Sequence, residues 1–217
     1  MDYSGFNMFD GIVYINLDHR KDRKKELLAE LKRLQVHKEK IHRIDAFYDS
    51  LNGHRGCALS HSKAIEFAIQ KKWGNVLILE DDFTTTKTIE EITSILKQFS
   101  QVLQNEWDVF LFGGNIKSYE PTQFEKIRRS LSATCGHAYV VNSHYFEKLK
   151  TLFVSSYDLM QNDFFFFHSR QNAFDQKWDV LMQQDRWYFI EIFAQQRVSY
   201  SDIELRDKDR RYRQDFD

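Results

Sequence analysis

The chain has 217 residues, with 31 Lys or Arg against 32 Asp or Glu and a formal net charge of −1. That balance excludes the basic excess expected of a general nucleic-acid binder. A hydrophobic content of 42% is enough for the core of one folded domain, and two cysteines without CxxC spacing exclude a disulfide scaffold.

Apolar runs and helical repeats alternate along the chain. Short apolar or β-branched runs predict buried strands at residues 11–17, 41–46, 76–79, 109–112, 138–141 and 187–193. Apolar residues at helical spacing predict helices at residues 22–35, 56–72, 88–103, 143–153 and 173–183. This alternation indicates an α/β fold with a mostly parallel sheet flanked by helices on both faces.

We find one proline and neither repeats nor a linker, so residues 1–217 are expected to form a single domain with a polar tail at 205–217. The charges of that tail balance, which does not support a polybasic membrane anchor. Apolar runs are too short to cross a bilayer, and no signal-peptide pattern opens the sequence. We therefore expect a cytoplasmic location, with peripheral membrane contact left open.

Three consecutive acids, Glu80, Asp81 and Asp82, follow the strand predicted at 76–79. In α/β sheets, ligands bind at the carboxyl ends of the strands. On an extended backbone Glu80 and Asp82 point to the same side, and a divalent cation removes the repulsion between them. Carboxylates suit Mg²⁺ or Mn²⁺. The alternative is an acidic turn before a helix whose N-terminus favours negative charge.

Seven short blocks carry a resemblance to a known family. They are residues 13–23 (VYINLDHRKDR), 43–46 (RIDA), 53–61 (GHRGCALSH), 79–82 (LEDD), 108–113 (DVFLFG), 137–139 (HAY) and 201–203 (SDI). In order and approximate spacing they resemble glycosyltransferase family 25, the lipooligosaccharide and procollagen galactosyltransferase type. The block at 53–61 is the most specific, and the set spans nearly the whole chain.

The resemblance implies a GT-A-like single domain that transfers a hexose, often galactose, with inversion from a UDP-sugar to a hydroxyl of a glycan or glycoconjugate. It implies Asp82 as the direct metal ligand, supported by Glu80, with Mn²⁺ or Mg²⁺ as the cofactor. The donor-binding residues that it implies, together with the chemistry of phosphate and sugar contacts, are Asn16, Arg20, Arg23, Ser60, His61, Glu80 and Asp81.

The residue types agree with that chemistry. Arg20 or Arg23 offers a bidentate contact to phosphate, although both also suit a solvated helix face. Gly53 and Gly56 permit close backbone approach before a helix whose first N–H groups attract anions. For His61 the alternative is a structural histidine bonded to the backbone.

An inverting transfer needs a base for the acceptor hydroxyl. Asp175 and Asp179 lie one helical turn apart and share a face of the helix predicted at 173–183. The family carries an Asp here that matches Asp175, although its usual preceding proline is absent. We therefore predict Asp175 as the base, with Asp163 and Asp202 as the next candidates.

Two other functions compete with this prediction. A nucleotidyltransferase also pairs an α/β sheet with carboxylates and Mg²⁺, but it should show a Gly-rich loop after the first strand, and residues 18–23 contain no glycine. A catalytically inactive GT-A-like module that binds nucleotide-sugars or glycans is the other alternative. Retention of the three acids together with Asp175 disfavours it.

Overall fold

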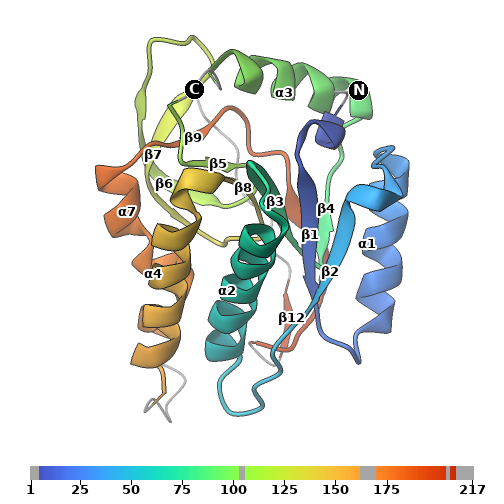
Figure 1. The fold of residues 1–217 in the computed structure, drawn as a ribbon. Coiled ribbons are helices and arrows are strands. Elements are labelled where there is room, and N and C mark those ends of the chain that lie inside the picture. The colour runs from blue at the N-terminus through green and yellow to red at the C-terminus, as the bar shows by residue number, and fades with distance from the viewer. Residues whose placement is uncertain (1–4, 103–105, 162–169, 204–205, 209–217) are drawn as a thin grey trace.

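The computed structural model describes residues 5–102, 106–161, 170–203 and 206–208, and their main element is an eight-stranded sheet with the order β2-β1-β3-β8-β5-β9-β7-β6 (Figure 1). Its strands are β1 (Gly11–Asn16), β2 (Ile41–Asp45), β3 (Asn75–Glu80), β5 (Val109–Leu111), β6 (Asn115–Pro121), β7 (Arg128–Thr134), β8 (Ala138–Asn142) and β9 (Trp187–Phe189). Two small pairings stand apart from it: β4 (Phe83–Thr84) with β10 (Gln195–Gln196), and β11 (Ser199–Ser201) with β12 (Arg206–Lys208).

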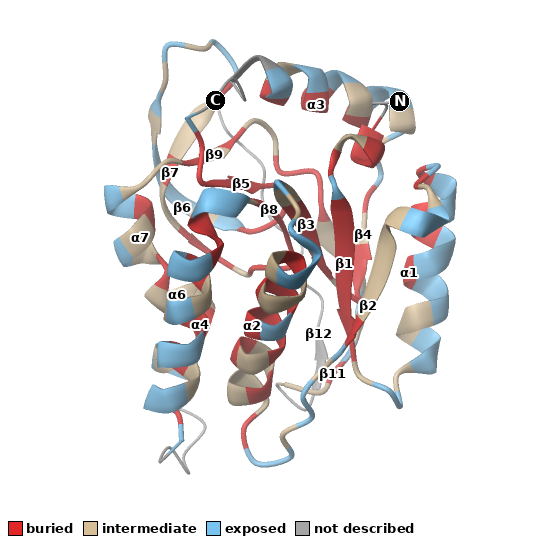
Figure 2. Cartoon of the chain, viewed as in Figure 1, coloured by how far each residue is buried: buried red, intermediate tan, exposed pale blue. Residues whose placement is uncertain are grey.

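Helices cover the sheet on both faces. They are α1 (Lys21–Arg33), α2 (Gly53–Lys71), α3 (Ile89–Val102), α4 (Phe146–Leu159), α6 (Phe174–Lys177) and α7 (Asp179–Gln184), with short 3-10 turns η1 (Gly5–Met8), η2 (Lys38–Lys40) and η3 (Ser143–Tyr145). Alternate strand residues face opposite layers, so Val13 packs in the core under α2 and α4, and Ile12 in the core under α1 and α3. Figure 2 shows the resulting buried sheet between two outward-facing helix layers.

The α/β prediction is confirmed, with one correction: the sheet is mixed. β1 pairs in parallel with β2 and β3, and β5 with β9, but β8 runs antiparallel to β3 and β5, and β7 antiparallel to β6 and β9. The cause is the β6–β7 hairpin, which turns the chain around between β5 and β8. Its strand β6 is largely exposed and polar, so it lacks the apolar signal used for prediction.

Two predicted elements differ in extent. The helix at 173–183 is broken into α6 and α7 at Trp178, whose fully buried indole donates a hydrogen bond to the Ala133 carbonyl at 2.7 Å. The strand at 187–193 ends at Phe189, after which the chain leaves the sheet. Within the tail at 205–217, the described residues form β12.

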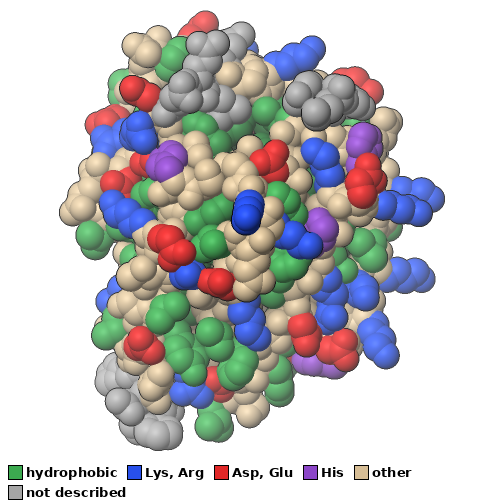
Figure 3. Space-filling model, viewed as in Figure 1, with side chains coloured by type: hydrophobic (Ala, Val, Ile, Leu, Met, Phe, Trp, Pro, Cys, Tyr) green, Lys and Arg blue, Asp and Glu red, His purple; other side chains and the backbone are tan. Residues whose placement is uncertain are grey.

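Among the described residues, no helix is long and apolar enough to cross a membrane. Figure 3 shows basic and acidic side chains interspersed over one face of the molecule, with basic ones gathering on the side where α1 lies.

Candidate active site

A cleft lies at the carboxyl ends of β1, β2 and β3, with a cavity volume of about 160 Å³. One water needs only about 10–15 Å³ by this measure, so the cleft has room for a ligand of many atoms. Its walls come from the ends of these strands, the start of α2, the start of α6 and the return segment, by which we mean residues 195–203. This is the edge at which α/β sheets bind their ligands.

The acidic triplet (Glu80, Asp81 and Asp82) forms part of the cleft wall, as the sequence predicted. Glu80 ends β3, and the two aspartates form the turn into β4, where only 7% and 8% of their surface is exposed. The Gln196 amide Nε2 is 3.1 Å from Glu80 Oε2 and 3.5 Å from Asp82 Oδ1. Glu80 and Asp82 therefore face one point in common, which agrees with the predicted alternation.

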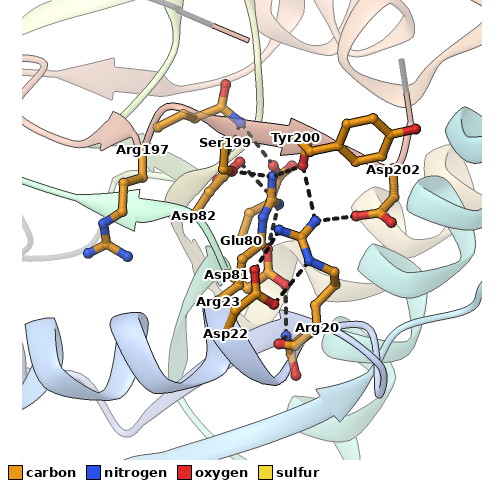
Figure 4. A network of polar contacts seen from close by, with 12 residues as sticks. Arg20, Asp22, Arg23, Glu80, Asp81, Asp82, Arg197, Ser199, Tyr200 and Asp202 are labelled. Carbon is orange, nitrogen blue, oxygen red and sulfur yellow. Dashed lines mark hydrogen bonds and ion pairs between the residues drawn. The ribbon is translucent and has the colours of Figure 1, made fainter. Parts of the chain in front are cut away.

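Asp81 faces away from that point, toward Arg23 and Asn16. The Arg23 guanidinium donates to Asp81 Oδ1 at 2.9 Å and lies 3.4 Å from Asp82 Oδ2, and the Asn16 amide donates to Asp81 Oδ2 at 2.8 Å. The second terminal nitrogen of Arg23 donates to Ser199 Oγ and to the Tyr200 carbonyl (Figure 4). Arg23 thus supplies one positive charge to two carboxylates, Asp81 and Asp82.

Burial and mutual repulsion change the acidity of this triplet. Burial, followed by the nearby Glu80 carboxylate, raises the pKa of Asp82 to about 7, although the Arg23 charge opposes the shift. Burial also raises the pKa of Asp81, against the effects of Arg23 and Asn16. At Asp81 and Asp82, burial and repulsion by neighbouring carboxylates therefore outweigh the charge of Arg23.

Arg20 and Asn16 lie outside the cleft lining. Arg20 pairs with Asp22 and Asp202 and donates to the Tyr200 carbonyl, so it fixes the return segment against the start of α1 (Figure 4). Asn16, which is fully buried behind Asp81, also accepts a hydrogen bond from Arg43. In this structure Asn16 and Arg20 hold Asp81 and the return segment in place without lining the cleft, whereas Arg23 lines it.

Ser60 and His61 both line the cleft from α2. The Ser60 hydroxyl donates to the Gly56 carbonyl and accepts from the Phe47 N–H, so it holds the loop before α2 against that helix. His61 is fully buried, with Nδ1 2.7 Å from the Tyr139 hydroxyl and Nε2 3.4 Å from Glu80 Oε1. Both contacts are with side chains, so His61 is not the backbone-bonded histidine that the sequence left as an alternative.

Asp175 lines the cleft, and its Oδ2 accepts a hydrogen bond from the Cys135 N–H at 2.8 Å. Asp179 accepts from the Ser132 hydroxyl and the Ala133 N–H and is outside the cleft lining. Of the two carboxylates considered for the base, Asp175 is therefore the one placed to meet a ligand. Asp202 also lines the cleft but is paired with Arg20 and His19, and Asp163 lies outside the described residues.

The glycines at the start of α2 allow other parts of the chain to pack closely against this helix, and Gly53 also lines the cleft. A Cβ at Gly53 would stand 2.7 Å from the Ile203 Cα, and a Cβ at Gly56 would stand 2.5 Å from the Phe47 carbonyl oxygen. The absence of a side chain at these two glycines therefore lets Ile203 and the Phe47 carbonyl pack against the α2 backbone.

Several lining residues escaped the sequence analysis. Gln196, Arg197 and Ser199 belong to the return segment, and Phe47 and Tyr48 to the loop before α2. The Arg197 N–H donates to the Asp82 carbonyl at 2.7 Å, while its side chain points away toward Glu26 (Figure 4). The block at 201–203 was the one sequence signal near this segment.

No protein-family model matches the chain, and no curated protein matches it. Among solved structures it is similar to the mannose-1-phosphate geranyltransferase from Thermus thermophilus, at 11% identity and a TM-score of 0.48, over 85% of this chain and 74% of that one. It is also similar to a glycosyltransferase involved in glycosylation of the major capsid of PBCV-1, at 8% identity and a TM-score of 0.48, over 83% of this chain and 92% of that one. A third, A197 from STIV, shares 13% identity with a TM-score of 0.44, over 94% of this chain and 96% of that one. At these identities and scores the likenesses carry no argument about what this chain does.

Proposed function

We propose that this protein is a metal-dependent glycosyltransferase of the GT-A type. It moves a hexose, with galactose favoured, from a UDP-sugar to a hydroxyl of a glycan or glycoconjugate, with inversion at the anomeric carbon. The observation that carries the proposal is the acidic triplet in the wall of a ligand-sized cleft at the carboxyl end of β3, with Asp81 and Asp82 buried and Glu80 half-buried beside them. Burying two carboxylates beside one guanidinium and a third carboxylate costs free energy that a bound cation would offset.

The donor atoms of the triplet fit Mn²⁺ or Mg²⁺. Glu80 and Asp82 offer hard carboxylate oxygens that face one point, where the neutral Gln196 amide now donates to both. These two residues would hold the ion. When bound, it would act as a Lewis acid for the negative charge that builds on the leaving diphosphate.

The other residues of the site would contact the sugar and the phosphates of the donor. Asp81 is held by Arg23 and Asn16, so it is placed to accept hydrogen bonds from donor hydroxyls. Arg23 lines the cleft, where its positive charge can attract a phosphate of the donor. The aromatic rings of Phe47 and Tyr48 also line the cleft and provide apolar surface for a sugar ring or base.

Asp175 serves as the base in this proposal. The acceptor oxygen forms its bond to the anomeric carbon as the bond from that carbon to the diphosphate oxygen breaks, and the hydroxyl proton passes to the Asp175 carboxylate. The Cys135 N–H holds one oxygen of this carboxylate. No covalent sugar–enzyme intermediate forms, and the released nucleotide carries away the negative charge.

A panel of nucleotide-sugars, each with Mn²⁺, tests the proposal. We expect UDP-hexoses to raise the melting temperature and to be hydrolysed slowly to UDP when acceptor is absent, with EDTA abolishing the turnover. Stabilisation without any turnover would favour an inactive binding module. Release of pyrophosphate from a nucleoside triphosphate and a sugar phosphate, with UDP-sugars inert, would favour a nucleotidyltransferase.

A further inference from the structure

Three metal-ligating side chains converge on the inner wall of the cleft, beside the acidic triplet. Cys57 and His61 are four residues apart on α2 and therefore share one face of that helix, and Glu80 stands opposite them at the end of β3. The Cys57 Sγ, one imidazole nitrogen of His61 and one Glu80 oxygen all lie within 4.8 Å of one another. All three residues line the cleft.

His61 carries the strongest indication of a ligand. Its ring is fully buried, and its Nε2 has no hydrogen-bond partner among the described residues. Glu80 Oε1 is 3.4 Å from that nitrogen, which is within ion-pair reach but lacks hydrogen-bond geometry. With the ring proton on Nδ1 and donated to the Tyr139 hydroxyl at 2.7 Å, Nε2 presents its lone pair to the cluster.

Histidines that bind metals have this arrangement, because a partner on the second ring nitrogen fixes the tautomer and the ring orientation. The spacing also fits. Two ligands held tetrahedrally by Zn²⁺ at about 2.0–2.2 Å stand about 3.4 Å apart, which is the distance between His61 Nε2 and Glu80 Oε1. The Cys57 sulfur lies within 4.8 Å of both other atoms, so a shift of up to about 1.3 Å would complete three ligands.

We propose that Cys57, His61 and Glu80 form a second metal site, selective for a borderline-soft divalent cation such as Zn²⁺. The thiolate and imidazole favour that class of ion over Mn²⁺ or Mg²⁺, which prefer the all-oxygen donors of the triplet. Glu80 belongs to both sites through different oxygens, since Oε1 faces His61 and Oε2 accepts from Gln196. This site does not depend on the proposed transferase activity.

Cobalt substitution tests the site directly. Reduced, chelator-treated protein is titrated with Co²⁺, which gives a thiolate-to-metal absorption band only when a cysteine binds it, and Zn²⁺ is then added. We expect one equivalent of Co²⁺ to give that band and one equivalent of Zn²⁺ to remove it. Cys57→Ser should abolish the band and weaken Zn²⁺ binding by more than about 100-fold, since loss of even a second-layer partner costs 10–100-fold.

Two variants serve as controls. Cys135→Ser removes the other cysteine of the same cleft and should leave the cobalt band unchanged. Asp82→Asn removes the ligand predicted for Mn²⁺ and should also leave it unchanged, so failure of this proposal and failure of the proposed function can be told apart. His61→Gln should lose Zn²⁺ affinity as Cys57→Ser does. Circular dichroism confirms the fold of each variant.

Folded wild-type protein that gives no thiolate band with Co²⁺ would overturn the proposal. A band of full strength in Cys57→Ser would do so as well, and so would a band that disappears in Cys135→Ser instead.

Discussion

At the scale of single residues, the main feature of the site is the pairing of two buried carboxylates, Asp81 and Asp82, with one arginine. Among the described side chains, Arg23 forms ion pairs with Asp81 and Asp82, whereas Arg20 forms ion pairs with Asp22 and Asp202. The two arginines lie three positions apart on the same turn of the chain, and sequence alone offered no ground for separating them. The structure assigns one to the cleft and the other to holding the return segment.

Asp82→Asn keeps the volume of the side chain and removes its charge. If Asp82 holds the ion, transfer should fall by roughly 10²–10³-fold, the effect of losing one preorganised electrostatic contact. Initial rates over a Mn²⁺ titration measure it. Asp45→Asn, an exposed carboxylate at the end of β2, is the control and should keep wild-type rates. Full activity of Asp82→Asn, or of metal-free wild type, would refute the metal assignment.

Arg23→Ala should affect both binding and stability. It leaves Asp81 buried with less compensation, so unfolding should become easier by roughly 3–5 kcal/mol, the usual effect of breaking a buried ion pair. UDP affinity should fall as well. Arg20→Ala should lower UDP affinity less than Arg23→Ala does, since Arg20 is outside the cleft lining and acts on it only through the return segment. Calorimetry with UDP and Mn²⁺, beside thermal melts, separates these effects. Equal UDP affinity in wild type and Arg23→Ala would remove Arg23 from the donor site.

Asp175→Asn tests the base. Turnover should drop by roughly 10²–10⁴-fold, the usual contribution of a general base, while UDP affinity stays unchanged. Asp179→Asn is the matched comparison on the next helix. Its carboxylate bonds Ser132 and Ala133, so its loss should lower stability by roughly 1–3 kcal/mol and leave the turnover of folded protein intact. If the two variants exchange these behaviours, the base is Asp179.

At the scale of elements, the cleft depends on segments that make few local interactions of their own. Gln196 and Arg197 reach the triplet because β10 pairs with β4, directly after Asp82. Ile203 reaches α2 because Gly53 has no side chain. The return segment is thus placed by long-range contacts.

Gly53→Ala tests that placement. The added Cβ would stand 2.7 Å from the Ile203 Cα, so one backbone must move. We expect faster amide hydrogen exchange in residues 199–203 and weaker UDP binding, with little change in the exchange of β1 and β3. Hydrogen-exchange mass spectrometry of the wild type and of Gly53→Ala measures this change in exchange rate. Unchanged exchange in 199–203 would mean that α2 and the return segment are coupled more loosely than the structure indicates.

The difference between elements set by local sequence pattern and segments placed by long-range contacts explains what the sequence could predict. Buried strands such as β1 and β3 have continuous apolar runs, and α1 to α4 have helical spacing, so their positions follow from local pattern. The strand β6 is polar and exposed and gave no such signal. The acidic triplet was found because consecutive acids after a buried strand are costly. Gln196 was missed because a lone polar residue acquires its place only through pairing with a distant strand.

At the scale of the whole molecule, the raised pKa of Asp82 links stability to pH. Native Asp82 holds its proton up to about pH 7, whereas an unfolded aspartate releases it near pH 3.9. Between these values the native state binds more protons, so this group's stabilisation is full at about pH 4 and is lost as pH rises toward 7.

We therefore expect metal-free wild type to lose stability relative to Asp82→Asn as pH rises from about 4 to 7. Mn²⁺ affinity of the wild type should rise over the same range, approaching tenfold per pH unit where one proton is displaced. Urea unfolding of both proteins at several pH values measures the first effect, and calorimetry the second. Parallel stability profiles for wild type and Asp82→Asn would show that Asp82 titrates normally.

The ion pairs and hydrogen bonds that hold Arg20 and Arg23 to the return segment join residues 176–182 positions apart. Loop closure over such a distance is slow and entropically costly, whereas β1, α1 and β2 follow one another directly. β1, α1 and β2 should therefore assemble early during folding, and the cleft should acquire its return segment last. A newly made chain would pass through a stage with its hydrophobic core formed and its chemistry still missing, and mild denaturant should return the mature protein to that stage.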